Sequence, residues 1–350
     1  MILVNNPGSW TNVYPPLLHA DWHGWTPTDL IFPFFLFIVG VSITLAFSSR
    51  KEQREPLKVL HGKIIRRSLV LFALGLFLSG FPFYDLNTIR IPGVLQRIAV
   101  CYFMAALIFM HSDVKTQAAW AIGLLAVYWA FMQWFPVPGV GAGSYEKGTN
   151  FSAWLDNLLL HGHMWSQSKT WDPEGIFSTL PAISTTLSGV LTGHFLRSDR
   201  TPANKTITLI LAGSIGMVAG WFWGHYLPIN KNLWTSSYAL FTSGMAAVTL
   251  AVSYYLVDIR GWRKLAHPFC VYGMNAITVF VLSGIVGRLL YLIKWTSGDS
   301  TITLKSWLLD SFFTPWLSPV NASLAYALSF VFLSYIAMFY LYKKQRFSKI

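Results

Sequence analysis

Long apolar segments separated by short polar ones run from one end of the 350-residue chain to the other. A segment buried in hydrocarbon must satisfy its own backbone amides, and runs of this length differ from the roughly ten-residue alternating strands of a membrane barrel. The pattern therefore predicts an all-α, polytopic membrane helical bundle with nine complete spans. The spans are expected near 29–47, 68–83, 93–110, 117–135, 176–196, 206–227, 233–257, 268–293 and 321–342.

The composition supports a membrane protein and excludes an ordinary soluble domain. Hydrophobic residues make up 54% of the chain and charged residues only 11%, whereas soluble domains carry roughly 25% charged residues. The apolar spans repeat throughout, so residues 1–350 are interpreted as a single transmembrane domain. The two cysteines, Cys101 and Cys270, both lie in apolar sequence and are expected to be free, buried thiols without a disulfide or a metal.

The net charge of +12 has a simpler explanation than nucleic-acid binding, because the basic residues gather in alternate loops. The loops on one side, together with the C-terminal tail, are rich in lysine and arginine, and those on the other side are nearly bare. This asymmetry predicts a cytoplasmic C-terminus and places the segment before the first span on the outer side. The basic set is Arg50, Lys51, Arg54, Lys58, Lys63, Arg66, Arg67, Lys115, Arg197, Arg200, Lys205, Arg260, Arg263, Lys264, Lys343, Lys344, Arg346 and Lys349.

Nine spans with this orientation put the N-terminus outside, with no preceding span to carry it there. Met1–Val4 resembles the end of a helix and is followed by the polar Asn5 and Asn6. We therefore expect that the chain begins late, that it lacks its first helix, and that the intact protein has ten spans. The alternative, that a short tail crosses the membrane unaided, stays open.

The unusual chemistry lies in the stretch HADWHGWTPTDLIFP, which leads into the first span. It contains His19, two carboxylates (Asp21 and Asp29) and Trp22. Ionisable groups at a bilayer boundary are costly, so they suggest a functional site. No third or fourth ligand is evident near His19 and His23, so a metal site is not expected there.

The motif RIPGVLQR offers a second candidate. Pro92 suits the first position of a helix, whose free amides and positive dipole end favour an anion. Arg90 and Arg97 are seven residues apart and would share one face if both were helical. Two interpretations stay open: a clamp for a phosphate or carboxylate, or an internal ion pair with Asp85 or Asp29.

Other polar residues of the predicted outer face have both a structural and a functional interpretation. Asp172 and Glu174 precede the fifth span and either cap it or belong to the site. The Asn230–Asn232 turn, which includes Lys231, either binds sugar hydroxyls or is simply polar. Asn275 lies in the eighth span, where a buried amide usually bridges helices.

Taken in order, several motifs resemble the heparan-α-glucosaminide N-acetyltransferase family. They are HADWHGWTPTDLIFPFFLFIVGVSI, RIPGVLQR, FPVPG, DPEG, PINKNLWTSSY and YGMN, and together they extend over nearly the whole chain. The resemblance implies a transmembrane acyltransferase that moves acetyl from cytosolic acetyl-CoA to an amino sugar or glycan on the far side of the membrane. His19 matches the active histidine of that family. The bacterial members are small inner-membrane proteins, which gives the expected localisation.

The site that the resemblance implies has three parts. The catalytic candidates are His19, as general base or as nucleophile, and Asp21 or Asp29, which would orient its ring. The candidates for acetyl-CoA, a co-substrate used without a metal, are Arg90, Arg97, Asn5 and Asn6. Lys63, Arg66 and Arg67 on the inner side are an alternative for its phosphates. The substrate-binding candidates are Trp22, Asp172, Glu174, Asn230, Lys231, Asn232, Trp234 and Asn275.

Against the animal members of that family, the chain as written is expected to lack their lumenal domain and most of the helix before Asn5. The natural acceptor is open. The expected partners are that small-molecule or glycan acceptor, membrane lipid and a possible second copy of the chain, but no nucleic acid. An amino-sugar transporter is the rival class, although the two halves show no convincing repeat of the kind common in transporters.

Overall fold

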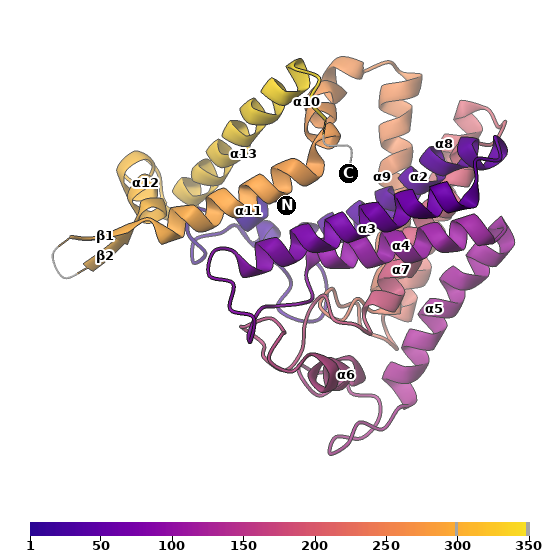
Figure 1. Ribbon diagram of the computed structural model, residues 1–350, viewed down its shortest axis with the longest axis horizontal. Coiled ribbons are helices and arrows are strands. Elements are labelled where there is room, and N and C mark those ends of the chain that lie inside the picture. Colours follow the sequence, from indigo (N-terminus) through magenta and orange to yellow (C-terminus); the bar gives the residue numbers. More distant parts are fainter. Residues whose placement is uncertain (298–299, 348–350) are drawn as a thin grey trace. The chain divides into compact units, whose positions relative to one another are not determined.

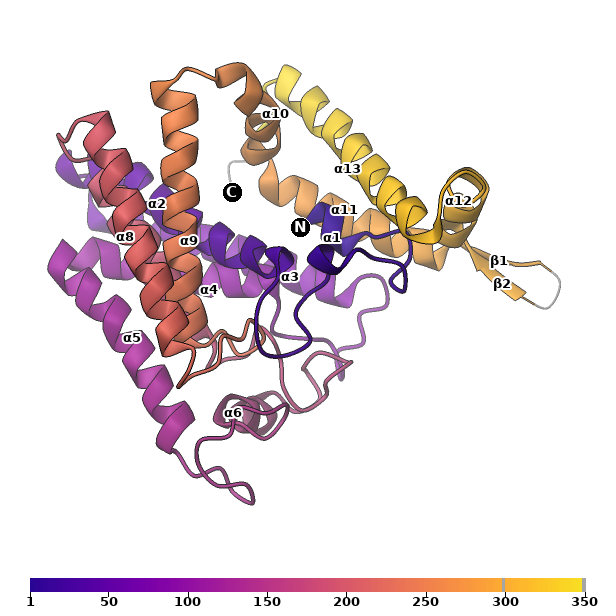
Figure 2. The same cartoon turned by 180° about the vertical axis from the view of Figure 1, so that it is seen from behind.

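The computed structural model describes residues 1–297 and 300–347 (Figures 1 and 2). In this part of the chain, helices account for nearly all of the regular structure, and one short β-hairpin accompanies them. The chain divides into two compact units. The first unit consists of Met1–His19, Thr26–Thr28 and Trp262–Ile350, and the second consists of Ala20–Trp25 and Asp29–Gly261.

The second unit contains the longer helical series. Its helices are α2 (Ile31–Glu52), α3 (Leu57–Gly80), α4 (Val94–His111), α5 (Val114–Trp134), α6 (Phe151–Leu160), α7 (Thr179–Leu196), α8 (Pro202–Trp223) and α9 (Ser236–Tyr254). Helix α7 packs against α2, α4, α5 and α9, and α8 lies along α9 (Figure 2). The helix α7 is therefore the centre of this bundle.

Glycine allows α2 and α7 to approach closely. A Cβ atom built on Gly40 would lie 1.9 Å from the carbonyl oxygen of Thr186, and one on Gly189 would lie 1.9 Å from that of Phe37. Small residues at a helix crossing let two backbones meet, which is the usual way in which membrane helices associate. The hydroxyl of Thr44 donates to the carbonyl of Val190 at 3.0 Å and ties the same two helices together.

The first unit contains the chain's two ends. Its elements are α1 (Ile2–Asn5), α10 (Arg263–Met274), α11 (Ala276–Leu292), β1 (Lys294–Ser297), β2 (Ser300–Thr303), α12 (Leu304–Phe312) and α13 (Pro319–Lys343). The antiparallel β1–β2 hairpin lies beside α12 (Figure 1). Helices α10 and α11 are bent by 68° at Asn275, so the span expected over 268–293 is wrong as one continuous helix.

The all-α, polytopic fold class is confirmed. Fewer than the nine expected spans are both long enough and apolar enough to cross a membrane. Each of the other eight expected segments overlaps one helix. Five helices in the described residues are long and apolar enough to cross a membrane, or six if the bent α10–α11 pair is one span. The remaining spans stay predictions. Helix α3 carries Lys63, Arg66 and Arg67 in its first half, and α7 is rich in serine and threonine, which lowers the hydropathy of each.

One expectation about the cysteines is wrong. Cys101 on α4 is buried, as expected, but Cys270 on α10 is exposed. Helix α10 buries only Val271 among its residues, so most of its apolar side chains face outward. An apolar run identifies a helix in a membrane protein, but it does not say which side of that helix meets the rest of the protein.

Candidate functional site

A buried cluster of two arginines and three carboxylates lies in the second unit, and we call it the arginine–carboxylate cluster. Its members are Arg90, Arg97, Asp156, Asp172 and Glu174. They come from the loop before α4, from α4 itself, from α6 and from the turn before α7. Charged side chains are rarely buried unless they are paired, so each contact within the cluster matters.

Arg90 holds two carboxylates at once. Its Nε donates to Asp172 Oδ2 at 2.8 Å, and its Nη2 donates to Asp172 Oδ1 at 2.6 Å and to Glu174 Oε2 at 2.5 Å. The side chains of Asp172 and Glu174 are 0% and 5% exposed, and that of Arg90 is 25% exposed. A two-pronged arginine–carboxylate contact is among the strongest ionic hydrogen bonds in proteins.

The charges of this ion pair are mutually stabilising. Burial alone would lower the pKa of Arg90, but the hydrogen bond to Asp172 and the charges of Glu174 and Asp172 raise it. Burial alone would raise the pKa of Glu174, but the positive charges of Arg90, Lys231 and Arg97 hold it below its usual value. Arg90 and Glu174 are therefore both charged at neutral pH.

The structure shows an internal ion pair for Arg90, which is one of the two interpretations that the sequence leaves open. Its partners are Asp172 and Glu174, rather than the expected Asp85 or Asp29. The carboxylate of Asp85 instead accepts a hydrogen bond from Thr88. Helix α4 begins at Val94, so the placement of Pro92 at its first position is wrong. Arg90 is outside the helix, and the two arginines meet the same turn, at residues 172–178, from different elements.

The turn Asp172–Gly175 is built around the Asp172 carboxylate. Besides Arg90, this carboxylate accepts hydrogen bonds from the backbone amides of Trp165 and Glu174, each at 2.9 Å. The N-cap of α7 is Ser178, without a side-chain cap. Asp172 and Glu174 therefore do not cap the helix, and instead fix the loop that precedes it.

Arg97 enters the same turn from α4. Its Nη2 donates to the carbonyl of Gly175 at 2.9 Å and to the hydroxyl of Ser178, and its guanidinium lies 5.3 Å from the ring centre of Trp234. The residue is 2% exposed. Its Nε and Nη1 have no hydrogen-bond partner among the described residues. Arg97 thus has unused donor capacity inside the protein.

Asp156 on α6 was not predicted from the sequence. Its Oδ1 accepts from the amide of Ile176 at 2.9 Å, while its Oδ2 is buried without a partner in the described part of the chain. Burial, together with the charge of Asp172, raises the pKa of Asp156 to about 7 despite the Ile176 hydrogen bond. The available signal was a lone carboxylate in the apolar run FSAWLDNLLL.

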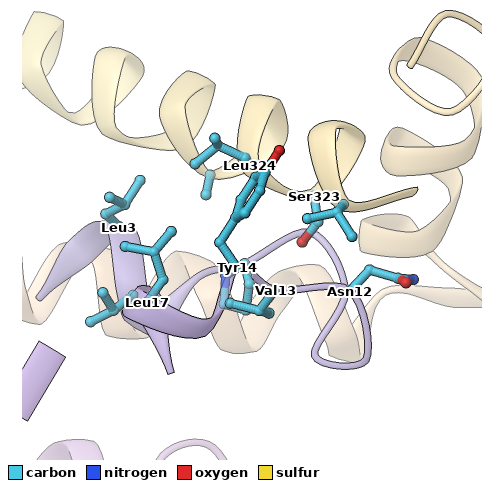
Figure 3. A pocket seen from close by; sticks show the side chains of 11 residues that line it. Leu3, Asn12, Val13, Tyr14, Leu17, Ser323 and Leu324 are labelled. Carbon is cyan, nitrogen blue, oxygen red and sulfur yellow. The ribbon is translucent and has the colours of Figure 1, made fainter. Parts of the chain in front are cut away.

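The segment that leads to His19 is anchored on α13 within the first unit. The amides of Gly8 and Ser9 donate to the carbonyl and hydroxyl of Ser323 at 3.2 and 3.0 Å, and Tyr14 donates to Asn321 Oδ1 at 2.5 Å. Figure 3 shows Tyr14 rising from this segment toward α13 beside Leu324. The small pocket there has a volume of about 10 Å³, which holds no more than a water molecule.

His19 itself is exposed and is the last residue of this part of the first unit. The next residue, Ala20, belongs to the second unit, where its amide donates to Asp29 Oδ2 at 3.0 Å. Asp29 is 1% exposed, and its carbonyl accepts from the Tyr238 hydroxyl at 2.5 Å. Asp29 thus fixes the backbone next to His19. The exposed Asp21 lies 3.4 Å from Lys147.

Several substrate-binding candidates have structural partners. The indole of Trp22 donates to the carbonyl of Tyr145 at 2.9 Å and packs edge-on against Trp171. Asn230 is buried, accepts from the amide of Leu233 at 2.9 Å, and lies 3.3 Å from His23. Trp234 is 0% exposed. Asn230 and Trp234 therefore shape the turn before α9 from inside.

The remaining candidates lie nearer the surface or in the first unit. Lys231 and Asn232 are half-buried in the same turn. Asn275 lies at the break between α10 and α11, and its amide is 3.4 Å from the carbonyl of Arg346. Asn6 donates to the carbonyl of Ile2 at 2.9 Å, and Asn5 is exposed. The described residues contain no group of three or more side chains placed to hold a metal ion.

Comparison with known proteins gives one family. The model of the heparan-alpha-glucosaminide N-acetyltransferase catalytic region matches residues 10–227. Heparan-alpha-glucosaminide N-acetyltransferase of Mus musculus is 30% identical over 337 residues, and that of Homo sapiens is 31% identical over 337 residues. Each match covers 80% of this chain and 50% of the relative, so the chain spans about half the length of the curated relatives it matches.

Proposed function

The chain belongs to the heparan-alpha-glucosaminide N-acetyltransferase catalytic family, and on that premise we propose that it is an integral-membrane acetyltransferase. It uses acetyl-CoA to acetylate an amino sugar or glycan. The observation that carries this proposal is the extent of the family match, residues 10–227. That range includes both His19 and the whole arginine–carboxylate cluster.

In this proposal His19 performs the proton transfer. As a general base, its imidazole takes one proton from the acceptor amine while the nitrogen bonds to the thioester carbonyl carbon. The carbon–sulfur bond then breaks, and the imidazolium returns the proton to the departing thiolate. In the nucleophilic version a ring nitrogen attacks the thioester carbonyl carbon, the carbon–sulfur bond breaks, and the departing thiolate takes the proton of the other ring nitrogen. The acceptor amine then attacks the acetyl carbon, the bond from that carbon to the ring nitrogen breaks, and the amine proton passes to the imidazole. The exposure of His19 and the anchoring of its segment by Tyr14 and Asp29 suit either role.

Acetyl-CoA supplies the activated thioester when it is bound. The donor set fits such a group, because two buried guanidinium nitrogens of Arg97 have no partner in the described part of the chain and can donate to an anionic or carbonyl oxygen. Arg90 is already engaged by Asp172 and Glu174, so its role in the proposal is to hold the turn in place. Arg67 is an alternative on the predicted inner side, because its Nε is also buried and has no hydrogen-bond partner among the described residues.

The proposed orientation follows the loop charges. His19 faces the outer side of a bacterial inner membrane, the C-terminus is cytoplasmic, and acetyl-CoA arrives from the cytoplasm. Among the acceptor candidates, Lys231 and Asn232 suit hydrogen bonding to sugar hydroxyls best, because both remain half-buried rather than fully enclosed.

The test uses purified protein in detergent with radiolabelled acetyl-CoA and glucosamine. We expect labelled N-acetylglucosamine, and a loss of about 10²-fold or more in the His19→Ala variant. The matched control is His23→Ala, an exposed histidine in the same segment, which should keep its activity within about threefold. Equal activity in the two variants would remove His19 from the mechanism, and no transfer by folded wild-type protein would reject the enzyme.

A transporter of amino sugars remains the second candidate because of one observation, the 68° break between α10 and α11 at Asn275. Transporters often build their substrate sites from interrupted membrane helices. Uptake of labelled N-acetylglucosamine into proteoliposomes without acetyl-CoA, abolished in an Asn275→Leu variant, would favour transport. The acetyltransferase proposal expects no uptake above that of empty liposomes.

A further inference from the structure

The first unit contains a large apolar cavity that the proposed reaction does not use. Its volume is about 490 Å³, within the range of roughly 300–1,000 Å³ that is common for ligand pockets. It lies among α11, α12 and α13. Its lining is almost wholly aliphatic and aromatic, with serine hydroxyls as the main polar groups.

Two packed clusters bound this cavity. At one end Val279 of α11 packs with Met338 of α13, and at the other Leu309 of α12 packs with Tyr326 of α13. Between these two clusters, side chains of α11, α12 and α13 line the open space of the cavity. Leu333 lines the cavity and is 65% exposed, so the cavity reaches the outward surface of a candidate membrane span.

A buried cation lies next to the cavity. Lys305 on α12 is 6% exposed, and its Nζ donates to the Tyr291 hydroxyl at 2.6 Å. Its Nζ also lies 6.0 Å from the ring centre of Tyr326, which lines the cavity, and Leu308, one helical turn further on, lines the cavity as well.

This lysine has no counter-charge in the described part of the chain, because no described carboxylate forms an ion pair with it. A buried ammonium without a counter-charge is costly, and of its three donor hydrogens the Tyr291 hydroxyl accepts one. A ligand with both an anionic group and an apolar chain could pair its charge with Lys305 and fill the cavity with its chain.

We propose that this cavity binds an acyl chain of an anionic membrane phospholipid, whose phosphate accepts hydrogen bonds from Lys305. The apolar lining excludes a polar ligand, and the positive charge of Lys305 selects an anionic headgroup over a zwitterionic one. The surrounding bilayer supplies such a lipid along α13, because only 17% of the most apolar part of this helix is buried. The proposal is independent of acetyl transfer.

The test uses phosphatidylglycerol and phosphatidylcholine with the same photoactivatable acyl chain, in protein-containing nanodiscs. Mass spectrometry then maps the labelled peptides. We expect cavity-lining peptides of α11 and α13 to be labelled about fivefold more by phosphatidylglycerol in the wild-type protein. Unlabelled phosphatidylglycerol should compete, whereas glycerol phosphate, a headgroup without chains, should not.

Three variants distinguish binding of the acyl chain in the cavity from recognition of the headgroup charge by Lys305. Ser329→Trp fills the cavity and should abolish its labelling by either lipid. Lys305→Gln should equalise the two lipids, and Lys294→Gln, an exposed lysine at the same end of α11, should leave the preference unchanged. Size-exclusion profiles verify that each variant is folded.

Three results would overturn the proposal. Equal labelling of wild-type protein by the two lipids would remove the role of the charge, and this comparison needs no variant. Labelling confined to Phe332 and Ile336, which are exposed and do not line the cavity, would show only general lipid contact. A covalent dimer cross-linked through this face would identify a second copy of the chain as the occupant.

Discussion

Replacing Arg90 by alanine tests the interpretation of the arginine–carboxylate cluster as a buried ion pair. The change leaves Asp172 and Glu174, 0% and 5% exposed, without the guanidinium that now contacts both. Asp172 keeps its two backbone amide donors, but Glu174 keeps only the more distant charges of Lys231 and Arg97. The variant therefore holds buried negative charge that the fold cannot easily hydrate.

The expected cost follows from this burial. Removing one partner of a buried ion pair costs about 3–5 kcal/mol, because the other charge stays desolvated. For a unit of this size, that corresponds to a fall of roughly 6–20 °C in the melting temperature. Arg90→Lys keeps the charge but loses the two-pronged contact, so its melting temperature should lie between those of Arg90→Ala and the wild type.

The assay is thermal unfolding in detergent at a fixed scan rate, followed by intrinsic tryptophan fluorescence. The control is Arg200→Ala, an exposed arginine outside any ion pair in the described residues, which should change stability by about 0.5 kcal/mol or less. The combined Arg90→Met, Asp172→Asn and Glu174→Gln variant should regain most of the lost stability. If the Arg90→Ala variant melts at the same temperature as the Arg200→Ala control, the ion pair does not stabilise the fold.

Three further predictions concern the same unit. The pKa of Asp156 is raised from its usual 3.8 to about 7, so its neutral form is favoured by folding, and stability should fall as the pH rises from about 4 to about 7, by up to roughly 4 kcal/mol. Asp156→Asn should flatten that profile in pH-dependent melting, and an unchanged profile would contradict the assignment. Gly175→Ala should cost about 1–3 kcal/mol in the same assay, because its Cβ would lie 1.9 Å from Asp156 Oδ2. Gly189→Ala should be at least as harmful at the α2–α7 crossing, whereas Gly123→Ala, whose Cβ meets nothing within 4 Å, should be neutral or stabilising.

The sequence predicted the helices well because hydrocarbon leaves a membrane segment few alternatives. It failed where a local feature overrides hydropathy. The run 268–293 is apolar throughout, yet the chain bends at Asn275. The exposed Cys270 shows the same limit, because hydropathy identifies a span without giving its orientation about the helix axis.

The sequence predicted single residues of the candidate site, but not which of them are in contact. The sequence identified Arg90, Asp172 and Glu174 individually, but their contact joins positions more than 80 residues apart, and no local pattern encodes it. Asp156 was missed for the same reason, because its environment is created by the turn at Gly175. His19 stands apart as the residue that its own segment and the family resemblance both indicated.

Acetyl transfer across a membrane with the participation of His19 can be measured in sealed proteoliposomes. Glucosamine is enclosed, labelled acetyl-CoA is added outside, and the trapped product is measured for wild-type protein, His19→Ala and His23→Ala. We expect labelled N-acetylglucosamine to accumulate inside with the wild type and the His23→Ala variant, and to be lost with the His19→Ala variant. Product that forms only when both substrates are on the same side of the membrane would contradict transfer across it. Equal product formation by the wild type and the His19→Ala variant would contradict the role of His19.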